Sequence, residues 1–182
     1  MLSEFSPGYP RQFEDVSYGR DALGREGYYI EPTPGEPNGD GVIGFLDSPA
    51  FSVERGCYEE PFTLELSSPD PLAVIRFTTD GSAPTGPNDG ALYREPIEIA
   101  ETATVRAASF REGYEPSDVM THTYVFLSQV VDQSNTQRGY PSSWSGRPAD
   151  YEMDPEVVGG NDLFNGVYRE SIVCLLYTSP SP

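Results

Sequence analysis

The stretch Ala73-Val74-Ile75-Arg76-Phe77-Thr78-Thr79-Asp80-Gly81 decides the fold class of this chain. Its β-branched and aromatic residues favour an extended strand, and the strand runs directly into an Asp-Gly pair. Because Asp-Gly supplies the positive φ that a tight turn needs, the chain is expected to reverse there. The stretch therefore predicts one strand of an antiparallel hairpin.

Further strands are expected on both sides of this hairpin. Residues 62–66, 96–99 and 104–108 alternate apolar and polar side chains, which is the period of a half-buried strand, and residues 121–126 close the series. Strands that recur with turn signals between them indicate an all-β fold, a small antiparallel fibronectin-III/immunoglobulin-like β-sandwich over residues 48–127. The predicted inward-facing set is Phe62, Leu64, Leu66, Ile75, Phe77, Ile97, Ile99, Val105, Ala107 and Tyr124.

The segments that flank the sandwich are rich in turn signals and expected to be irregular. The chain contains 18 Pro and 18 Gly, and many of them lie in residues 1–47, where short strands are predicted at 16–18 and 28–30. Residues 128–172 form a predicted connector, with a short helix from Pro155. Residues 1–47 are not expected to bury enough apolar surface to fold alone, and the connector is expected to be ordered against a neighbouring domain.

The charge balance is acidic and restricts the partners. Against 29 Asp and Glu the chain has 11 basic residues, which gives a net charge of −18. Such a surface repels phosphate backbones and anionic lipids, so we expect no nucleic-acid partner. No apolar run reaches the roughly 18 residues that span a bilayer, so no membrane insertion is expected.

The two cysteines, Cys57 and Cys174, show no metal-site or redox spacing. In an oxidising compartment they could pair. Alternatively Cys57 is a small buried or half-buried thiol. The N-terminus lacks a basic region followed by an apolar stretch, so a signal peptide is expected upstream.

Polar residues offer several candidate sites, each with a structural alternative. Asp80 beside Ser82 could bind a cation, but an Asp in such a turn also bonds nearby backbone N–H groups. The single histidine, His122, lacks partners for catalysis or metal binding and is expected at the surface or a sheet edge. Loop oxygens could bind calcium, or simply be solvated, at Asn38, Asp40, Asn88 and Asp89. Glu59-Glu60 are adjacent solvated acids rather than a glycosidase pair. We assign no catalytic, cofactor-binding or metal-binding residue, and we expect no cofactor.

Aromatic residues give the remaining binding hypothesis. Tyr58, Tyr93, Tyr114 and Trp144 could stack on sugar rings if they are flat and exposed. Tyr and Trp also fill sandwich cores and interdomain seams, because their rings are apolar and their tips polar. Both interpretations stay open from the sequence.

The order of motifs resembles the module at the C-terminus of chitobiases and β-hexosaminidases, also described as a fibronectin-III-associated repeat. The resemblance begins at residues 76–85, whose signature turn is Thr79, Asp80, Gly81, Ser82 and Pro84. It continues through Leu92-Tyr93, Glu95-Pro96-Ile97, Thr104-Val105-Arg106-Ala107 and Gly113-Tyr114-Glu115-Pro116-Ser117 to Thr121-His122-Thr123-Tyr124.

Weaker resemblances lie outside the sandwich. Residues 1–40 are similar to the C-terminal remnant of a bacterial lamin-tail domain. Residues 149–158 with Trp144 and Tyr168 resemble the connector that precedes a CotH-type kinase-like domain in large secreted bacterial proteins. Residues 173–182 resemble a translated sequencing-adapter tail and are expected to be non-native.

These observations lead to three hypotheses about function. In the first, the chain is a fragment of a large secreted protein and acts as a non-catalytic structural spacer, extracellular or at the cell surface, whose partners are neighbouring domains of the same polypeptide. In the second, it is a carbohydrate-binding accessory module of a glycoside hydrolase such as a chitinolytic enzyme, with a polysaccharide as partner. In the third, it belongs to an enzyme whose active site lies elsewhere.

Overall fold

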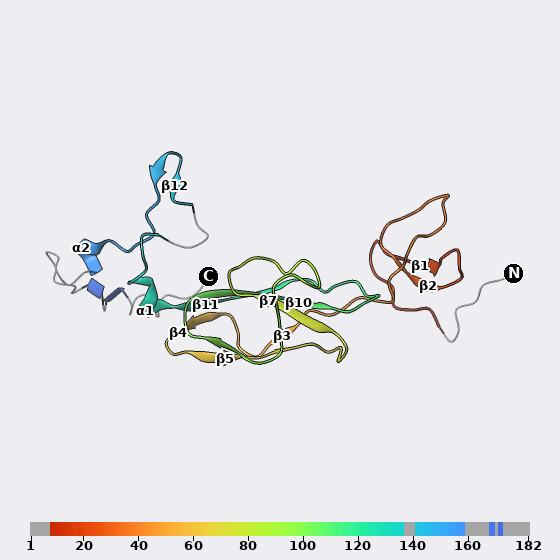
Figure 1. Cartoon of the computed structure of the whole chain (residues 1–182), viewed down its shortest axis with the longest axis horizontal. Helices are drawn as coiled ribbons and strands as arrows, with labels where there is room; N and C mark the ends of the chain where they lie inside the picture. The colour runs from red at the N-terminus through yellow and green to blue at the C-terminus, as the bar shows by residue number, and fades with distance from the viewer. Residues whose placement is uncertain (1–7, 137–140, 159–167, 170, 173–182) are drawn as a thin grey trace.

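The computed structural model describes residues 8–136, 141–158, 168–169 and 171–172, and shows an elongated molecule (Figure 1). A small hairpin lies at one end, a β-sandwich occupies the centre, and short helices with a second hairpin lie at the other end. The predicted non-native tail, residues 173–182, and Cys174 within it lie outside the described residues.

The larger layer of the sandwich is a five-stranded sheet. Its strands follow the order β4 (Gly56–Tyr58), β11 (Met120–Phe126), β10 (Ala103–Phe110), β7 (Val74–Thr78) and β8 (Ala91–Leu92). The pairs β11–β10, β10–β7 and β7–β8 are antiparallel, as predicted. In contrast β4 joins β11 in parallel, because both strands run away from the N-terminal hairpin.

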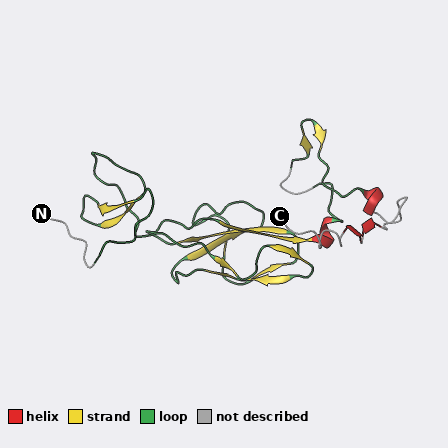
Figure 2. Ribbon diagram, turned by 180° about the vertical axis from the view of Figure 1, so that it is seen from behind, coloured by secondary structure: helices red, strands yellow, loops and turns green. Residues whose placement is uncertain are grey.

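The second layer consists of two short antiparallel pairs, visible below the main sheet in Figure 2. β5 (Phe62–Leu64) pairs with β9 (Ile97–Ile99), and β3 (Ala50–Phe51) pairs with β6 (Leu66–Ser67). The single strand predicted over residues 62–66 is therefore two strands with different partners. The change of partner occurs at Glu65, whose N–H donates to the Ser52 hydroxyl at 2.8 Å and whose carbonyl accepts from the Ser52 N–H at 2.9 Å.

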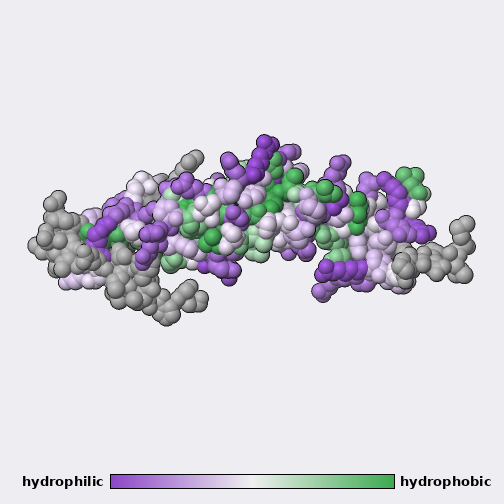
Figure 3. All heavy atoms as spheres, turned by 90° about the horizontal axis from the view of Figure 1, so that it is seen from below, coloured by the Kyte–Doolittle hydropathy of each residue, from purple (hydrophilic) through white to green (hydrophobic). Residues whose placement is uncertain are grey.

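The core lies between the two layers and confirms the predicted inward face. Its buried residues are Leu64, Leu66, Ile75, Ile99, Val105, Ala107, Tyr124 and Phe126. The other predicted members, Phe62, Phe77 and Ile97, are partly buried and pack against this cluster. Phe126, Phe51, Val53, Tyr58 and Tyr93 also join the core or its rim, although the predicted set omitted them. On the face that Figure 3 shows, hydrophilic residues predominate and apolar residues form small separate patches.

The turn after β7 differs from the predicted tight hairpin. Gly81 has the expected positive φ of 79°, but β8 begins only after the loop of residues 79–90. The Gly81 N–H donates to the Thr104 carbonyl at 3.2 Å, so the chain first follows β10 instead of returning along β7. Pro84 in this loop is fully buried, which fixes the loop against the sandwich.

The N-terminal hairpin consists of β1 (Ser17–Arg20) and β2 (Glu26–Tyr29), which overlap the strands predicted at 16–18 and 28–30. Its small core is aromatic, since Tyr28 contacts Phe13, Tyr18 and Phe45 with ring centroids 4.9 to 5.5 Å apart. Large aromatic rings bury much apolar surface per residue, so four of them can give this small segment a core.

Beyond the sandwich the structure contains α1 (Leu127–Val130), the hairpin β12 (Ser143–Trp144) and β13 (Arg147–Pro148), and α2 (Pro155–Val158). The short helix expected from Pro155 is confirmed, whereas the β12–β13 hairpin was not predicted. In the part of the chain that the structure describes, no helix has the length and apolar character needed to cross a membrane.

Truncation of the core should reveal its contribution to stability. Leu64 is 0% exposed and Leu72 is 68% exposed. We expect Leu64→Ala to lower the free energy of unfolding by about 2–5 kcal/mol, because it removes buried methyl groups and leaves a cavity. The matched control Leu72→Ala should change it by less than about 0.5 kcal/mol. Urea unfolding of both variants provides the measurement, and equal losses in the two would contradict this core.

Candidate functional site

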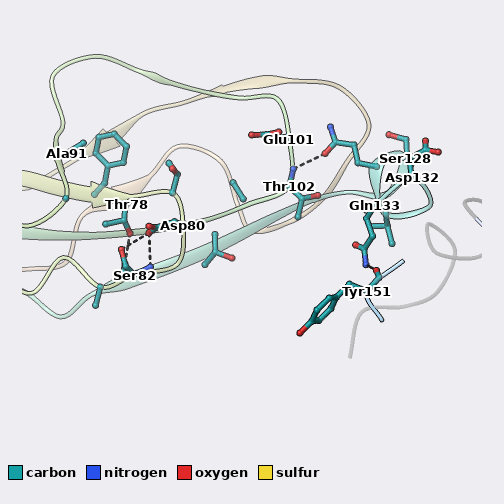
Figure 4. Close-up of a pocket in the computed structure, with 18 of the residues that line it drawn as sticks. Thr78, Asp80, Ser82, Ala91, Glu101, Thr102, Ser128, Asp132, Gln133 and Tyr151 are labelled. Atoms are coloured by element: carbon teal, nitrogen blue, oxygen red, sulfur yellow. Dashed lines mark hydrogen bonds between the residues drawn. The ribbon is translucent and has the colours of Figure 1, made fainter. Parts of the chain in front are cut away.

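A wide, open groove of about 1700 Å³ lies at the end of the sandwich nearest α1 (Figure 4). One wall consists of the loop after β7, with Asp80 and Ser82, and the other of α1 and the residues that follow it. Tyr151 and Arg169, from farther along the chain, complete the lining. Most of the side chains that line the groove are carboxylates, amides and hydroxyls.

The signature turn supplies one wall of the groove. Asp80 Oδ1 accepts hydrogen bonds from the Ser82 N–H at 3.0 Å and from the Ser82 hydroxyl at 2.6 Å. The Thr78 hydroxyl donates to the Ser82 carbonyl at 2.5 Å. Asp80 thus bonds a nearby backbone N–H, as its structural interpretation predicts, and this bond holds the loop in a local turn.

The opposite wall is joined to the sandwich by Gln129 of α1. Its Oε1 accepts from the Thr102 N–H and its Nε2 donates to the Ala100 carbonyl, both at 3.0 Å. Nearby, Arg169 pairs with Asp132. The guanidinium lowers the pKa of the Asp132 carboxyl, so this group stays ionised near neutral pH. Several groups that line the groove are therefore already bonded to one another or to the sandwich.

The four loop residues considered for calcium do not come together. Asn38 donates to the Arg20 carbonyl at 2.8 Å and Asp40 pairs with Arg25 at 3.3 Å, both in the N-terminal segment. Asp89 accepts from the Thr85 hydroxyl at 2.6 Å in the loop after β7, where Asn88 is its exposed neighbour. Across the described ranges, no three His, Cys, Asp or Glu side chains are grouped so that they could hold a metal ion.

His122 packs against neighbouring side chains of the sandwich. It lies on β11 before the residues that pair with β4, which are Tyr124 to Phe126, and it is half-buried. Its ring stacks on Phe51 with centroids 4.3 Å apart, and its Nδ1 lies 3.2 Å from the Val53 carbonyl oxygen. The alternation of β11 turns His122 towards the same face as Tyr124, which explains its burial.

The cysteine and paired acids of the β4 region are exposed. Cys57 is a free, exposed thiol on β4, which corrects the expected buried or half-buried thiol. The cause is its position on an edge strand, where one side of the backbone has no neighbouring strand. Glu59 and Glu60 follow β4 and are exposed, as adjacent solvated acids should be.

The three tyrosines considered for sugar stacking are half-buried in different surroundings. Tyr58 packs against Phe62 at a centroid distance of 4.5 Å and donates its hydroxyl to the Glu54 carbonyl. Tyr93 lies edge-on to Phe77 at 6.3 Å, and the Arg111 guanidinium lies over the Tyr114 ring at 4.4 Å. Each of the three rings thus contacts different neighbours, and sugar stacking by these tyrosines stays a prediction.

Tyr124 is the most perturbed ionisable group at the centre of the sandwich. It is 0% exposed, and its hydroxyl donates to the Val53 carbonyl at 2.9 Å. Burial raises the pKa of this phenol to about 12, with smaller contributions from Tyr58 and Glu54. The hydroxyl is thus a neutral structural donor rather than a reactive group.

The fold and this arrangement define a small immunoglobulin-like β-sandwich module, confirming the predicted fold class. Residues 53–121 match the family described as the chitobiase/beta-hexosaminidase C-terminal domain. The match extends from the segment before β4 to the start of β11 and thus covers most of the sandwich. Such a domain suggests an accessory module of a carbohydrate-active enzyme. No curated protein matches the chain.

The raised pKa of Tyr124 predicts a loss of stability in alkali. Because the folded state holds this proton more tightly than the unfolded chain, the contribution is fully present below pH 10.0 and is lost as the pH rises towards about 12. Tyr124→Phe cannot ionise at this position, so its unfolding free energy should fall less steeply over that interval. Urea unfolding at a series of pH values measures both slopes. Identical slopes in the variant and the unsubstituted protein would contradict this account.

Proposed function

We propose that this chain is a non-catalytic spacer module that holds its flanking domains at a fixed separation in an extracellular protein. The observation that carries the proposal is that the sandwich is hydrogen-bonded to the flanking segment at each of its two ends. A flexible linker would leave these backbone groups to water. A spacer instead needs joints that resist bending.

The N-terminal joint is a short ladder of backbone hydrogen bonds. The Ile43 N–H donates to the Gly113 carbonyl at 2.7 Å, and the Glu115 N–H donates to the Gly44 carbonyl at 2.9 Å. The Leu46 N–H then donates to the Glu115 carbonyl at 3.1 Å, and Leu46 is buried. The segment before the sandwich is therefore paired with the turn between β10 and β11.

A side-chain network strengthens the same joint. Arg111 pairs with Asp70 at 2.7 Å and its guanidinium lies over the ring of Tyr114. The pKa of the Asp70 carboxyl is lowered, first by the hydrogen bond from the Leu72 N–H and then by the Arg111 guanidinium. This ion pair therefore persists from neutral pH well into the acidic range.

The C-terminal joint has no loop between the sandwich and α1. β11 ends at Phe126 and α1 begins at Leu127, which is buried like Val131 one turn later. The Phe126 N–H donates to the Thr102 hydroxyl at 3.0 Å. With the two hydrogen bonds of Gln129, these contacts fix the direction in which the chain leaves the sandwich.

The wider setting is also part of the proposal. We infer a secreted multidomain parent in which residues 1–40 end a lamin-tail-like domain and residues 128–172 lead towards a CotH-type kinase-like domain. The motif resemblances of the two flanks support this parent. The description of the matched family supports the alternative, an accessory module of a glycoside hydrolase. Neither parent requires a reaction in these residues.

Loosening one joint should convert the spacer into a hinged molecule. We expect Gln129→Ala to broaden the small-angle X-ray scattering distance distribution, because it removes both hydrogen bonds that join α1 to the sandwich. Gln12→Ala is the matched control, since Gln12 bonds only the Pro10 carbonyl two residues away. The spacer proposal fails if the unsubstituted chain already scatters as a flexible ensemble, or if Gln129→Ala scatters like Gln12→Ala.

A further inference from the structure

The β12–β13 hairpin projects from the elongated body (Figures 1 and 2). Its turn is Ser145-Gly146, with φ angles of 49° and 79°. Positive φ at both central residues is typical of a type I′ two-residue hairpin, whose twist matches that of its strands. The register pairs Trp144 with Arg147 directly beside the turn.

The base of this hairpin is fixed while its tip is open. The Ala149 N–H donates to the Ser142 carbonyl at 3.0 Å, and the Tyr151 hydroxyl donates to the Pro141 carbonyl at 2.8 Å. Every residue from 141 to 148 is nevertheless exposed. The tip is therefore accessible to a ligand, and the hydrogen bonds at the base hold it in place.

Trp144 is the largest apolar side chain at this tip. It is 58% exposed and is the single tryptophan of the chain. Trp144 therefore takes no part in the core of the described residues, whereas Tyr58, Tyr93 and Tyr114 are half-buried. The indole therefore offers a flat apolar surface with one N–H donor at its edge.

Arg147 lies beside this indole and adds hydrogen-bond donors. As directly opposed residues on paired strands, Trp144 and Arg147 project from the same face of the hairpin, about 5.5 Å apart at Cα. Among the described residues no carboxylate lies within ion-pair distance of Arg147, although Arg20, Arg111 and Arg169 each have one. Its guanidinium is thus available to a ligand.

We propose that the hairpin of residues 141–148 is a binding site for a neutral polysaccharide. The Trp144 ring stacks on the apolar face of a pyranose, and the Arg147 guanidinium donates to its ring or hydroxyl oxygens. The hydroxyls of Ser143 and Ser145 add adaptable donors and acceptors. A rigid aromatic anchor with Arg and Ser around it is also the composition of engineered and natural binding loops.

Size and charge favour a sugar ring over the other classes of ligand. A stable protein interface buries about 800 Å² on each partner and uses roughly 20–30 residues, far more than this hairpin tip presents. A single sugar ring, in contrast, covers one indole. The net charge of −18 repels nucleic acids and polyuronates, so the polysaccharide is neutral.

The site does not depend on the spacer function, because the hairpin lies outside the sandwich and its joints. Intrinsic fluorescence tests it directly, since Trp144 is the single tryptophan. The full chain is titrated with N-acetylglucosamine, glucose and xylose hexasaccharides up to about 1 mM, the upper range of weak binding. Binding should shift the emission to shorter wavelength and protect it from acrylamide quenching. No change with any neutral probe would overturn the proposal.

Variants studied by calorimetry locate the site. With the hexasaccharide that binds best, Trp144→Ala should lose at least about tenfold in affinity, as expected for an aromatic anchor, and Trp144→Phe should lose less. The matched control Tyr9→Ala removes another exposed ring, 79% exposed in the N-terminal segment, and should leave affinity unchanged. Full affinity in Trp144→Ala, or a response to polygalacturonate or an acidic peptide alone, would contradict the proposal.

Discussion

The pairing of β11 with β10 is the interaction on which the rest of the structure depends. Its register, from Ala103 opposite Tyr124 to Ala107 opposite Met120, places Tyr124 and Phe126 in the core. A slip of one residue would turn both rings to the outer face and move Thr123 and Val125 inward. The buried hydroxyl of Tyr124 opposes such a slip, because turning it outward would break its hydrogen bond to the Val53 carbonyl.

The same strand gives the module its mechanical character. β11 begins just after the turn of residues 113–115 that pairs with the incoming segment, and it ends where α1 starts. β11 therefore runs most of the way between the two joints, with β10 paired along Met120 to Tyr124 and β4 along Tyr124 to Phe126. This arrangement suits the spacer role that we propose, and the projecting β12–β13 hairpin lies outside it.

Much of the fold could be predicted because alternating apolar and polar residues indicate which face of a strand is buried. Residues 104–108 and 121–126 showed the strands and their inward face, and the positive φ of Gly81 followed from its lack of a Cβ. The strands β3, β4 and β8 were missed because two or three residues carry no periodic signal. The length of the loop after β7 depends on the Thr104 carbonyl, a tertiary partner that local sequence does not reveal. For the site, Tyr and Trp side chains suit a core rim and a surface equally, so the sequence alone could not predict that Tyr58, Tyr93 and Tyr114 are half-buried and Trp144 exposed. The Ser145-Gly146 pair was a turn signal that could have located the hairpin.

Native-state hydrogen exchange tests the central claim, that the joints and the sandwich form one cooperative unit. The informative amides are those of Ile43 and Glu115 at one joint and of Thr102 at the other, compared with Val105 and Ala107 in β10. If the account is right, the joint amides exchange through the same opening as β10 and show a similar free energy of exchange. Exchange of the joint amides at rates typical of open loops, while β10 stays protected, would contradict it.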